Sequence, residues 1–499
     1  MKPSIHSDPL YTNPIRIGAF EIRPLDLLEH VLGTGGTGSG KTRSFLLPLV
    51  ESVLERFGNN ADSRAGMFMI DAKGDMGRLG AECVRRSGRS DGLYILGPGG
   101  NCWFPLFSQF EGDATRVANF LFEILEDRSG QGVSQNESFW EENARRLLRA
   151  GAICAKASHG IELGGLDGIS AAISSIMDTH SPSDDEDPGD DENDCDKLSA
   201  VLEDGFVRGR IGRRELEETL DYVRRDVVRG NPRTWATISN MTRNFLSQFS
   251  MPPLRDIFEE RPGKRRVGPE DVIDEGLLLL VSLSPVVFGE ASAPFRIAIK
   301  KAFFNRILQR DHLVTVEDGQ RRLINRNRPI LAVMDEFHTT LAAQGTSSDA
   351  YFLDRAREFR CMCILATQGI SAISSVIRNE GLRNHLLNNC RTKFFFGNDC
   401  PETTAYFEYI GGLEDRMMQT QGFQPVPAPA RFRLPNHTFI APRCLLMTSV
   451  GFAQNREPRF HGADLGSLPN GTALVVQKGR ALILYEKDPA DYTLVPPEP

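Results

Sequence analysis

Short apolar runs alternate with helix-like stretches at both ends of the chain. Near the N-terminus, a helical period of apolar positions extends from Thr42 to Phe57, and another helical stretch covers 291–309. The expected strands are 15–22, 30–33, 67–71, 93–96, 277–283, 330–335, 362–367, 392–396 and a closing hairpin of 473–477 with 481–485. Strands that alternate with helices predict an α/β fold whose mainly parallel central sheet is covered on both faces.

The middle of the chain has a different pattern. Residues 113–180 and 198–249 show helical spacing of apolar positions and few β-branched runs. Between them, 184–196 holds nine carboxylates and no basic residue, and such a stretch cannot bury enough surface to fold. We therefore expect a disordered acidic loop at 181–197. The predicted organisation is an α/β domain at 1–106, a mostly helical insertion at 107–264 and the second part of the α/β domain at 265–499.

A glycine-rich loop follows the second expected strand. Its residues fit the pattern G-x-x-x-x-G-K-[ST] of phosphate-binding loops: Gly35, Gly36, Thr37, Gly38, Ser39, Gly40, Lys41 and Thr42. The glycines let backbone N–H groups surround a phosphate at the positive end of the next helix. Lys41 would neutralise the β- and γ-phosphates, Thr42 would hold magnesium, and Arg43 lies beside them. A merely flexible loop is the alternative, but the flanking strand and helix favour a site for ATP and Mg²⁺.

The second element of the candidate site is a pair of acidic residues at the end of an expected buried strand. Five apolar residues, 330–334, lead to Asp335 and Glu336. Asp335 would join the magnesium shell, and Glu336 would polarise the attacking water. A strand followed by an acidic helix cap would give the same pattern. The phosphate loop favours the catalytic interpretation, because a glutamate directly after the magnesium aspartate suits hydrolysis.

Polar residues at the ends of two other segments are further candidates. Gln368 follows the apolar run 361–367, where an amide can report the γ-phosphate to a moving element or simply cap the strand. Arg355, Arg357 and Arg360 lie in the preceding helical stretch. One of them could reach a neighbouring subunit's γ-phosphate as an arginine finger, or all could form a solvated helix face.

The stretch Asp71-Ala-Lys73-Gly74-Asp75 ends the strand after the phosphate-loop helix. It is an alternative position for a magnesium carboxylate. The pattern alone favours a loop contact near the nucleotide, because a Lys-Gly step is an unusual end for a buried strand.

Composition changes this picture little. The 499 residues carry a net charge of −8, and the acidic stretch accounts for all of it. Global charge therefore neither supports nor excludes DNA binding. Among nine cysteines there is no C-x-x-C pair, and Cys361 and Cys363 alternate in an apolar run as core residues do. No signal peptide or apolar window long enough for a bilayer is seen, so we expect a cytoplasmic protein, or one held peripherally at the inner membrane by a partner.

These elements, in this order, resemble the type IV coupling proteins of bacterial conjugation and secretion, a RecA-like motor lineage related to FtsK and HerA. The resemblance covers most of the chain in short blocks. The matching blocks are Leu47-Pro48, 71–75, 139–148, 235–249, Asp335-Glu336-Phe337, the eleven-residue spacing from Arg357 to Gln368, 393–397, 402–403 and 468–489. Transmembrane helices, which membrane-bound members carry at their start, are not found here.

The resemblance implies a homo-hexameric ring with ATP between subunits and DNA in a central channel. It implies that the helical insertion contacts the cargo or its adaptor, such as a relaxase or a secretion-channel protein. It also makes Arg357 the preferred arginine finger and Lys73 a neighbour of the nucleotide.

Three functions remain open from the sequence. The first is a DNA-translocating ATPase of the coupling-protein type. The second is an ATPase of the same lineage that a protein partner gates in a defence or mobile-element complex. The third is a scaffold that binds nucleotide without turnover, against which Glu336 argues, because a fixed switch needs no activating carboxylate.

Overall fold

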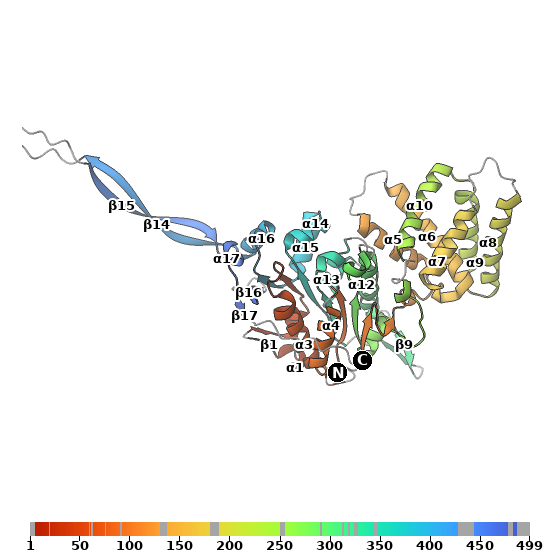
Figure 1. The fold of residues 1–499 in the computed structure, drawn as a ribbon, viewed down its shortest axis with the longest axis horizontal. Coiled ribbons are helices and arrows are strands. Elements are labelled where there is room, and N and C mark those ends of the chain that lie inside the picture. The colour runs from red at the N-terminus through yellow and green to blue at the C-terminus, as the bar shows by residue number, and fades with distance from the viewer. Residues whose placement is uncertain are drawn as a thin grey trace, which may run out of the picture.

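The computed structural model of the chain describes residues 5–18, 20–58, 60, 63–74, 76–89, 92–129, 137–179, 189–249, 255–289, 292–311, 314–317, 320–323, 328–343, 348–427, 444–477 and 483–486. A helical bundle lies on one side of a central α/β body, and a long hairpin projects from the other side (Figure 1).

In the described residues, the central sheet has nine strands in the order β17-β16-β13-β3-β12-β11-β4-β8-β5. Their bounds, in that order, are Ile483–Glu486, Thr472–Gln477, Thr392–Phe396, Val31–Thr34, Cys361–Thr367, Ile330–Met334, Gly66–Asp71, Leu278–Ser282 and Leu93–Leu96. Strands β13 to β5 run parallel, and β16 and β17 add an antiparallel edge. The predicted mainly parallel α/β fold and the closing hairpin are confirmed.

Both faces of this sheet are buried, because successive side chains point to opposite sides. In β4, Phe68 and Ile70 belong to one core, while Met67 and Met69 belong to another. The first core contains α12 (Ser292–Leu308), whose Phe303 ring stacks on that of Phe68 with centroids 4.2 Å apart. The second contains the helix after the phosphate loop, α3 (Leu47–Phe57), and α4 (Met76–Arg86). These two layers hold the strand ends at fixed positions.

The carboxyl ends of the parallel strands meet at one edge of the sheet, where ligands bind in open α/β folds. At this edge, the first residue after each of five strands (β3, β4, β11, β12 and β13) is, in the same order, Gly35, Ala72, Asp335, Gln368 and Gly397. The sequence candidates that directly follow a strand therefore gather at this edge.

The helical bundle is inserted between β5 and β8. Its helices are α5 (Ala114–Ser129), α6 (Glu137–His159), α7 (Gly165–Asp178), α8 (Gly189–Val207), α9 (Arg213–Tyr222) and α10 (Pro232–Phe249). Two short strands, β6 (Cys102–Trp103) and β7 (Arg265–Arg266), pair in parallel where the chain enters and leaves the bundle. The apolar core of the bundle continues into one face of the sheet. The predicted boundaries at 107 and 264 stay predictions.

The acidic stretch differs from its prediction as a loop over 181–197. Residues from Gly189 onward lie in α8, and 181–188 lie outside the described residues. Leu198 and Leu202 lie one turn apart in α8, and both are buried in the apolar core of the bundle. Composition predicted disorder because it does not register this apolar face, which tertiary packing buries.

A hairpin that the sequence analysis did not anticipate leaves the body after α16 (Pro401–Gly411). Its strands are β14 (Leu413–Pro427) and β15 (Cys444–Pro458), and they pair with each other along their whole length. The hairpin extends away from the sheet and the bundle (Figure 1). Polar residues, glycines and prolines interrupt its apolar pattern, so the alternation that marks a strand is weak here.

The remaining elements are small. The expected strand at 15–22 is a hairpin of β1 (Ile15–Ile17) and β2 (Phe20–Ile22). A second small hairpin joins β9 (Val314–Glu317) and β10 (Gln320–Leu323). The other helices are α1 (Pro9–Thr12), α2 (Pro24–Leu27), α11 (Pro285–Phe288), α13 (Asp349–Arg355), α14 (Ile370–Val376), α15 (Glu380–Asn389) and α17 (Ala463–Gly466). Among the helices of the described residues, none combines the length and the apolar character needed to cross a bilayer.

Candidate nucleotide site

The glycine-rich loop joins β3 to a wide, π-type helical turn at Lys41–Leu46 that continues into α3. Gly38 and Gly40 have φ values of 80° and 96°, which side chains with a Cβ rarely adopt. A Cβ on Gly40 would also lie 2.8 Å from the backbone nitrogen of Gly471. The loop is fixed from outside as well, since the N–H of Gly36 donates to the carbonyl of Gly397 at 2.8 Å. The two glycines are therefore needed to shape this loop.

Lys41 and Ser39 are the buried polar side chains of the loop. The ammonium group of Lys41 donates to the carbonyls of Gly35 and Gly36, the latter at 2.9 Å. Burial lowers the pKa of Lys41, while the nearby Glu336 raises it. Among the described residues, the Ser39 hydroxyl is buried without a hydrogen-bond partner. A buried cation and an unused donor inside a glycine loop fit a phosphate group.

Thr42 lies opposite Asp335, the residue directly after β11. The Thr42 hydroxyl donates to Asp335 Oδ2 at 3.2 Å, and Asp335 Oδ1 accepts from the N–H of Glu336 at 3.0 Å. Burial raises the pKa of Asp335, and Lys73 and Lys41 act against this rise. Magnesium prefers oxygen ligands and is commonly held by one carboxylate together with phosphate oxygens. The hydroxyl and carboxylate of this pair are therefore suitable ligands for Mg²⁺.

Glu336 is buried in an unusual backbone conformation. Its φ and ψ angles are 48° and 49°, the left-handed region that costs a non-glycine residue free energy. Its carboxylate forms an ion pair with Lys73. His338 Nδ1 lies 3.5 Å from Glu336 Oε2 and 3.2 Å from the hydroxyl of Thr367. Burial lowers the pKa of His338, so the ring is neutral near pH 7. Strain of this kind is concentrated at functional sites.

The turn after β4 positions Lys73. Asp71 Oδ1 accepts from the N–H groups of Lys73 and Gly74 at 2.8 and 3.0 Å, which closes a tight turn. Ser284 donates to the carbonyl of Lys73 at 3.0 Å. Burial lowers the pKa of Lys73, but Asp335 and Glu336 outweigh it, and the net shift is upward. Asp71 thus shapes the turn, and Lys73 supplies the positive charge beside the two site carboxylates.

Gln368 lies beside the loop, as its position after β12 requires. The N–H of Gly35 donates to the carbonyl of Thr367 at 3.3 Å, and Asn398 donates to the carbonyl of Gln368 at 2.7 Å. The side chain of Gln368 is exposed. An exposed amide next to the phosphate loop is free to meet a ligand or a neighbouring chain.

Arg357 does not reach this site within one chain. It precedes β12, whereas the nucleotide loop follows β3, so the two lie at opposite edges of the sheet. The Arg357 guanidinium forms an ion pair with Glu29 at 3.0 Å. Arg355 and Arg360 lie over the rings of Tyr351 and Tyr11. Any contact between Arg357 and a nucleotide would therefore have to come from another subunit.

The loop also has an exposed side. Thr37, Gly38 and Arg43 are exposed, whereas Gly35 and Lys41 are buried. Sequence reasoning missed His338 and Asn398, which lie next to the site. His338 sits two residues after Glu336 and could have been found from this spacing, but nothing in the sequence marks Asn398.

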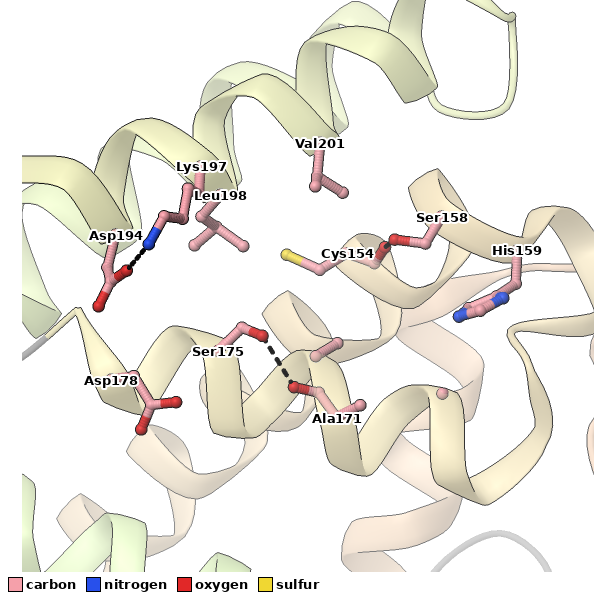
Figure 2. A pocket seen from close by; sticks show the side chains of 12 residues that line it. Cys154, Ser158, His159, Ala171, Ser175, Asp178, Asp194, Lys197, Leu198 and Val201 are labelled. Carbon is pink, nitrogen blue, oxygen red and sulfur yellow. Dashed lines mark hydrogen bonds and ion pairs between the residues drawn. The ribbon is translucent and has the colours of Figure 1, made fainter.

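A separate cavity of about 250 Å³ lies between α6, α7 and α8 of the bundle (Figure 2). Asp194 and Lys197 form an ion pair with each other at 2.7 Å. Ser158 and Ser175 donate to carbonyls of their own helices at 3.1 Å. These polar groups are satisfied within single helices, so they form no reactive cluster in the cavity.

Comparisons with known proteins show what this fold resembles. A scan against protein-family models and a search of curated proteins found no match. Among solved structures, the unbound "bacterial conjugative coupling protein TrwBdeltaN70" superposes with a TM-score of 0.62 at 15% identity, covering 97% of this chain and 91% of the other. Plasmid coupling protein TrwB in complex with ADP and Mg²⁺ gives 0.60 at 16% identity, covering 97% and 90%. TrwB with a non-hydrolysable ATP analogue gives 0.58 at 16% identity, covering 97% and 91%. The chain therefore has the RecA-like P-loop fold of these proteins.

Proposed function

We propose that this chain, which shares the fold of conjugative coupling protein TrwB, is an ATP-hydrolysing motor that moves DNA or nucleoprotein cargo in a conjugative type of transfer. The observation that carries the proposal is one constellation at the carboxyl edge of the sheet. A glycine loop with a buried lysine lies against a hydroxyl-carboxylate pair and a strained, buried glutamate. The TrwB structures with ADP and Mg²⁺ and with an ATP analogue support the same ligands here.

Each residue of the constellation then has a role. Lys41 leaves the loop carbonyls to neutralise the β- and γ-phosphates, and the loop N–H groups and Ser39 bind phosphate oxygens. Thr42 and Asp335 hold Mg²⁺, which would balance the charge of the transferred phosphoryl group. Glu336 orients water and accepts its proton. Lys73 holds Glu336 in place through their ion pair, and its charge favours the ionised form of Asp335.

The motor is proposed to work as a homo-hexamer. Arg357 lies at the edge of the sheet opposite its own nucleotide loop, so an arginine finger at this position can act only on a neighbouring subunit. A ring places DNA in its centre, where weak phosphate contacts from several subunits add up. The helical insertion would then contact a relaxase, an adaptor or a channel protein. We also propose that the protein works in the cytoplasm, at the inner membrane when a partner binds it there.

ATP hydrolysis tests the proposal directly. Steady-state turnover is measured with and without single- and double-stranded DNA, for the wild type and for Glu336→Gln. We expect DNA to stimulate turnover and Glu336→Gln to abolish it while ATP binding persists. Absence of ATP binding would refute the nucleotide site. Binding with turnover that DNA never stimulates would refute the DNA motor and indicate an ATPase gated by a protein partner.

A further inference from the structure

The ring of His338 lies inside the candidate site, and the backbone on both sides of it is fixed. Glu336 turns the chain into a short 3₁₀ helix, Phe337–Thr340. The N–H and the hydroxyl of Thr339 both donate to the carbonyl of Glu336, at 2.8 and 2.9 Å. Phe337 is fully buried in the core. This short helix therefore holds His338 beside the carboxylate of Glu336.

One ring nitrogen of His338 faces two oxygen atoms. His338 Nδ1 lies 3.5 Å from Glu336 Oε2 and 3.2 Å from the hydroxyl oxygen of Thr367. An ionised carboxylate only accepts hydrogen bonds, so an unprotonated Nδ1 would turn its lone pair toward a negative charge. A proton on Nδ1 can instead be donated to the carboxylate and to the hydroxyl. The geometry thus favours the ring tautomer that carries its proton on Nδ1.

The two carboxylate oxygens of Glu336 have different partners. Oε1 forms the ion pair with Lys73, and Oε2 faces His338. Lys73 has 41% of its side chain exposed and carries its charge on a flexible four-carbon stem, so it attracts the carboxylate without fixing its direction. The ring of His338 is rigid, only 20% exposed and in contact with Thr367, which is completely buried. His338 is therefore better suited than Lys73 to fix how the carboxylate is turned.

Thr367 also connects this contact to the phosphate loop. It is the last residue of β12, and its carbonyl accepts from the N–H of Gly35 at 3.3 Å, while its hydroxyl contacts His338. The first residue of the loop and the ring beside Glu336 are thus attached to one buried residue. This common attachment fixes the place of Glu336 relative to a phosphate in the loop.

We propose that His338 is a positioning residue that turns the carboxylate of Glu336 toward the attacking water. This role presupposes the ATP hydrolysis proposed above. A general base works within about 2.6–3.2 Å of the group whose proton it accepts, and a displacement of about 1 Å can cost about a hundredfold in rate. The 3.5 Å separation has to shorten by about 0.5 Å to reach ordinary hydrogen-bond length. A carboxylate has about four acceptor sites, so Glu336 can bind Lys73, His338 and the water together.

Three substitutions of His338 in the full chain test this role. The amide nitrogen introduced by His338→Asn takes the place of Nδ1, that introduced by His338→Gln takes the place of Nε2, and His338→Ala supplies neither. In steady-state ATP turnover with DNA, we expect kcat to fall about tenfold to a hundredfold in His338→Ala and His338→Gln, but less than about threefold in His338→Asn. KM, and the ATP affinity measured by isothermal titration calorimetry, should stay unchanged, because a positioning residue does not touch the nucleotide. The control is His385→Ala, which truncates an exposed histidine of α15 and should leave kcat unchanged.

Thr367→Val tests the contact that holds the ring. This substitution nearly keeps the shape of the side chain and removes its hydroxyl. We expect it to lower kcat in the wild type and to cause no further loss in His338→Ala, because both changes break the same connection. Losses that add up in the double variant would overturn the proposal.

NMR of protein with isotope-labelled histidine tests the contact without any turnover. The signals of His338 are assigned by their disappearance in His338→Asn, and we expect them to show the proton on Nδ1. A proton on Nε2 alone would overturn the proposal, because Nδ1 could then not donate to Glu336.

Two kinetic results would also overturn the proposal: an unchanged kcat in His338→Ala, or equal values in His338→Asn and His338→Gln. A loss of ATP affinity at unchanged kcat would assign His338 to the nucleotide instead. A wild type that hydrolyses no ATP would refute the proposed function, whereas the tautomer of His338 would still decide whether the contact with Glu336 exists.

Discussion

A buried ion pair behind the candidate site allows one prediction to be worked out in detail. Lys300 in α12 and Asp349 at the start of α13 have 0% and 1% of their side chains exposed, and Lys300 Nζ lies 2.6 Å from Asp349 Oδ2. Lys300 also donates to the carbonyl of Thr340, and Asp349 accepts from the N–H of Ala342 at 2.6 Å. Burial lowers the pKa of Lys300 and raises that of Asp349, while each opposes the shift of the other. The pair thus anchors the segment that leaves Glu336.

Lys300→Met removes one charge and leaves the other buried without compensation. Such a loss costs about 3–5 kcal/mol, a large part of the roughly 5–15 kcal/mol by which a domain is stable. For a body of this size, about 2 °C per kcal/mol corresponds to a fall of roughly 6–10 °C in melting temperature. In Lys300→Met with Asp349→Asn neither member of this pair carries a charge, while an acceptor for Ala342 is kept. We expect this double variant to recover most of the loss.

The measurement is thermal unfolding of the wild type, both variants and Lys197→Met. Lys197 forms an exposed ion pair with Asp194, so the same substitution there should cost about 1 kcal/mol or less. A Lys300→Met variant no less stable than Lys197→Met would refute the reasoning, because desolvation of the remaining carboxylate would then be negligible. A double variant no better than Lys300→Met would show that packing, not charge, sets the cost.

Three other predictions concern the site and its surroundings. Gly40→Ala should lower the affinity for ATP by at least about tenfold, because the φ angle of Gly40 is 96° and the new Cβ would meet the backbone of Gly471. Isothermal titration calorimetry measures this affinity, and an unchanged value would show that the loop adapts. Lys73→Met should reduce ATP turnover at pH 7 and shift the acidic limb of the pH–rate profile to higher pH, because Lys73 lowers the pKa of Asp335. An acidic limb at the same pH as in the wild type would contradict this role. Burial lowers the pKa of His30 from 6.5 to about 4, so the unfolded chain binds the extra proton between these values and stability falls as the pH falls through this window. His30→Asn should therefore flatten the acid side of the stability profile by up to about 1.4 kcal/mol per pH unit, and an unchanged slope in thermal melts across pH 7 to 5 would rule this out.

Local patterns predicted much of the body because each buried strand is a short apolar run. The apolar runs that contain β11, β12 and β13 are typical of strands in a parallel sheet that is covered on both faces, so their secondary structure could be predicted locally. The hairpin of β14 and β15 escaped prediction because its pairing joins distant residues and its pattern mixes apolar, polar and proline positions. Long-range pairing of this kind leaves little signal in a local window of sequence.

The candidate site, like the fold, could be predicted only in part from the sequence. The sequence alone determined which residues have the chemistry: a glycine loop with Lys41 and Thr42, and the adjacent carboxylates Asp335 and Glu336. Only the tertiary structure decided which of them meet, because strand order sets which loops share an edge of the sheet. It brought Lys73 to Glu336, added His338 and placed Arg357 at the opposite edge. The spacing of residues along the chain shows which chemical groups the site can contain. The distances between these groups follow from the order in which the strands pair in the sheet.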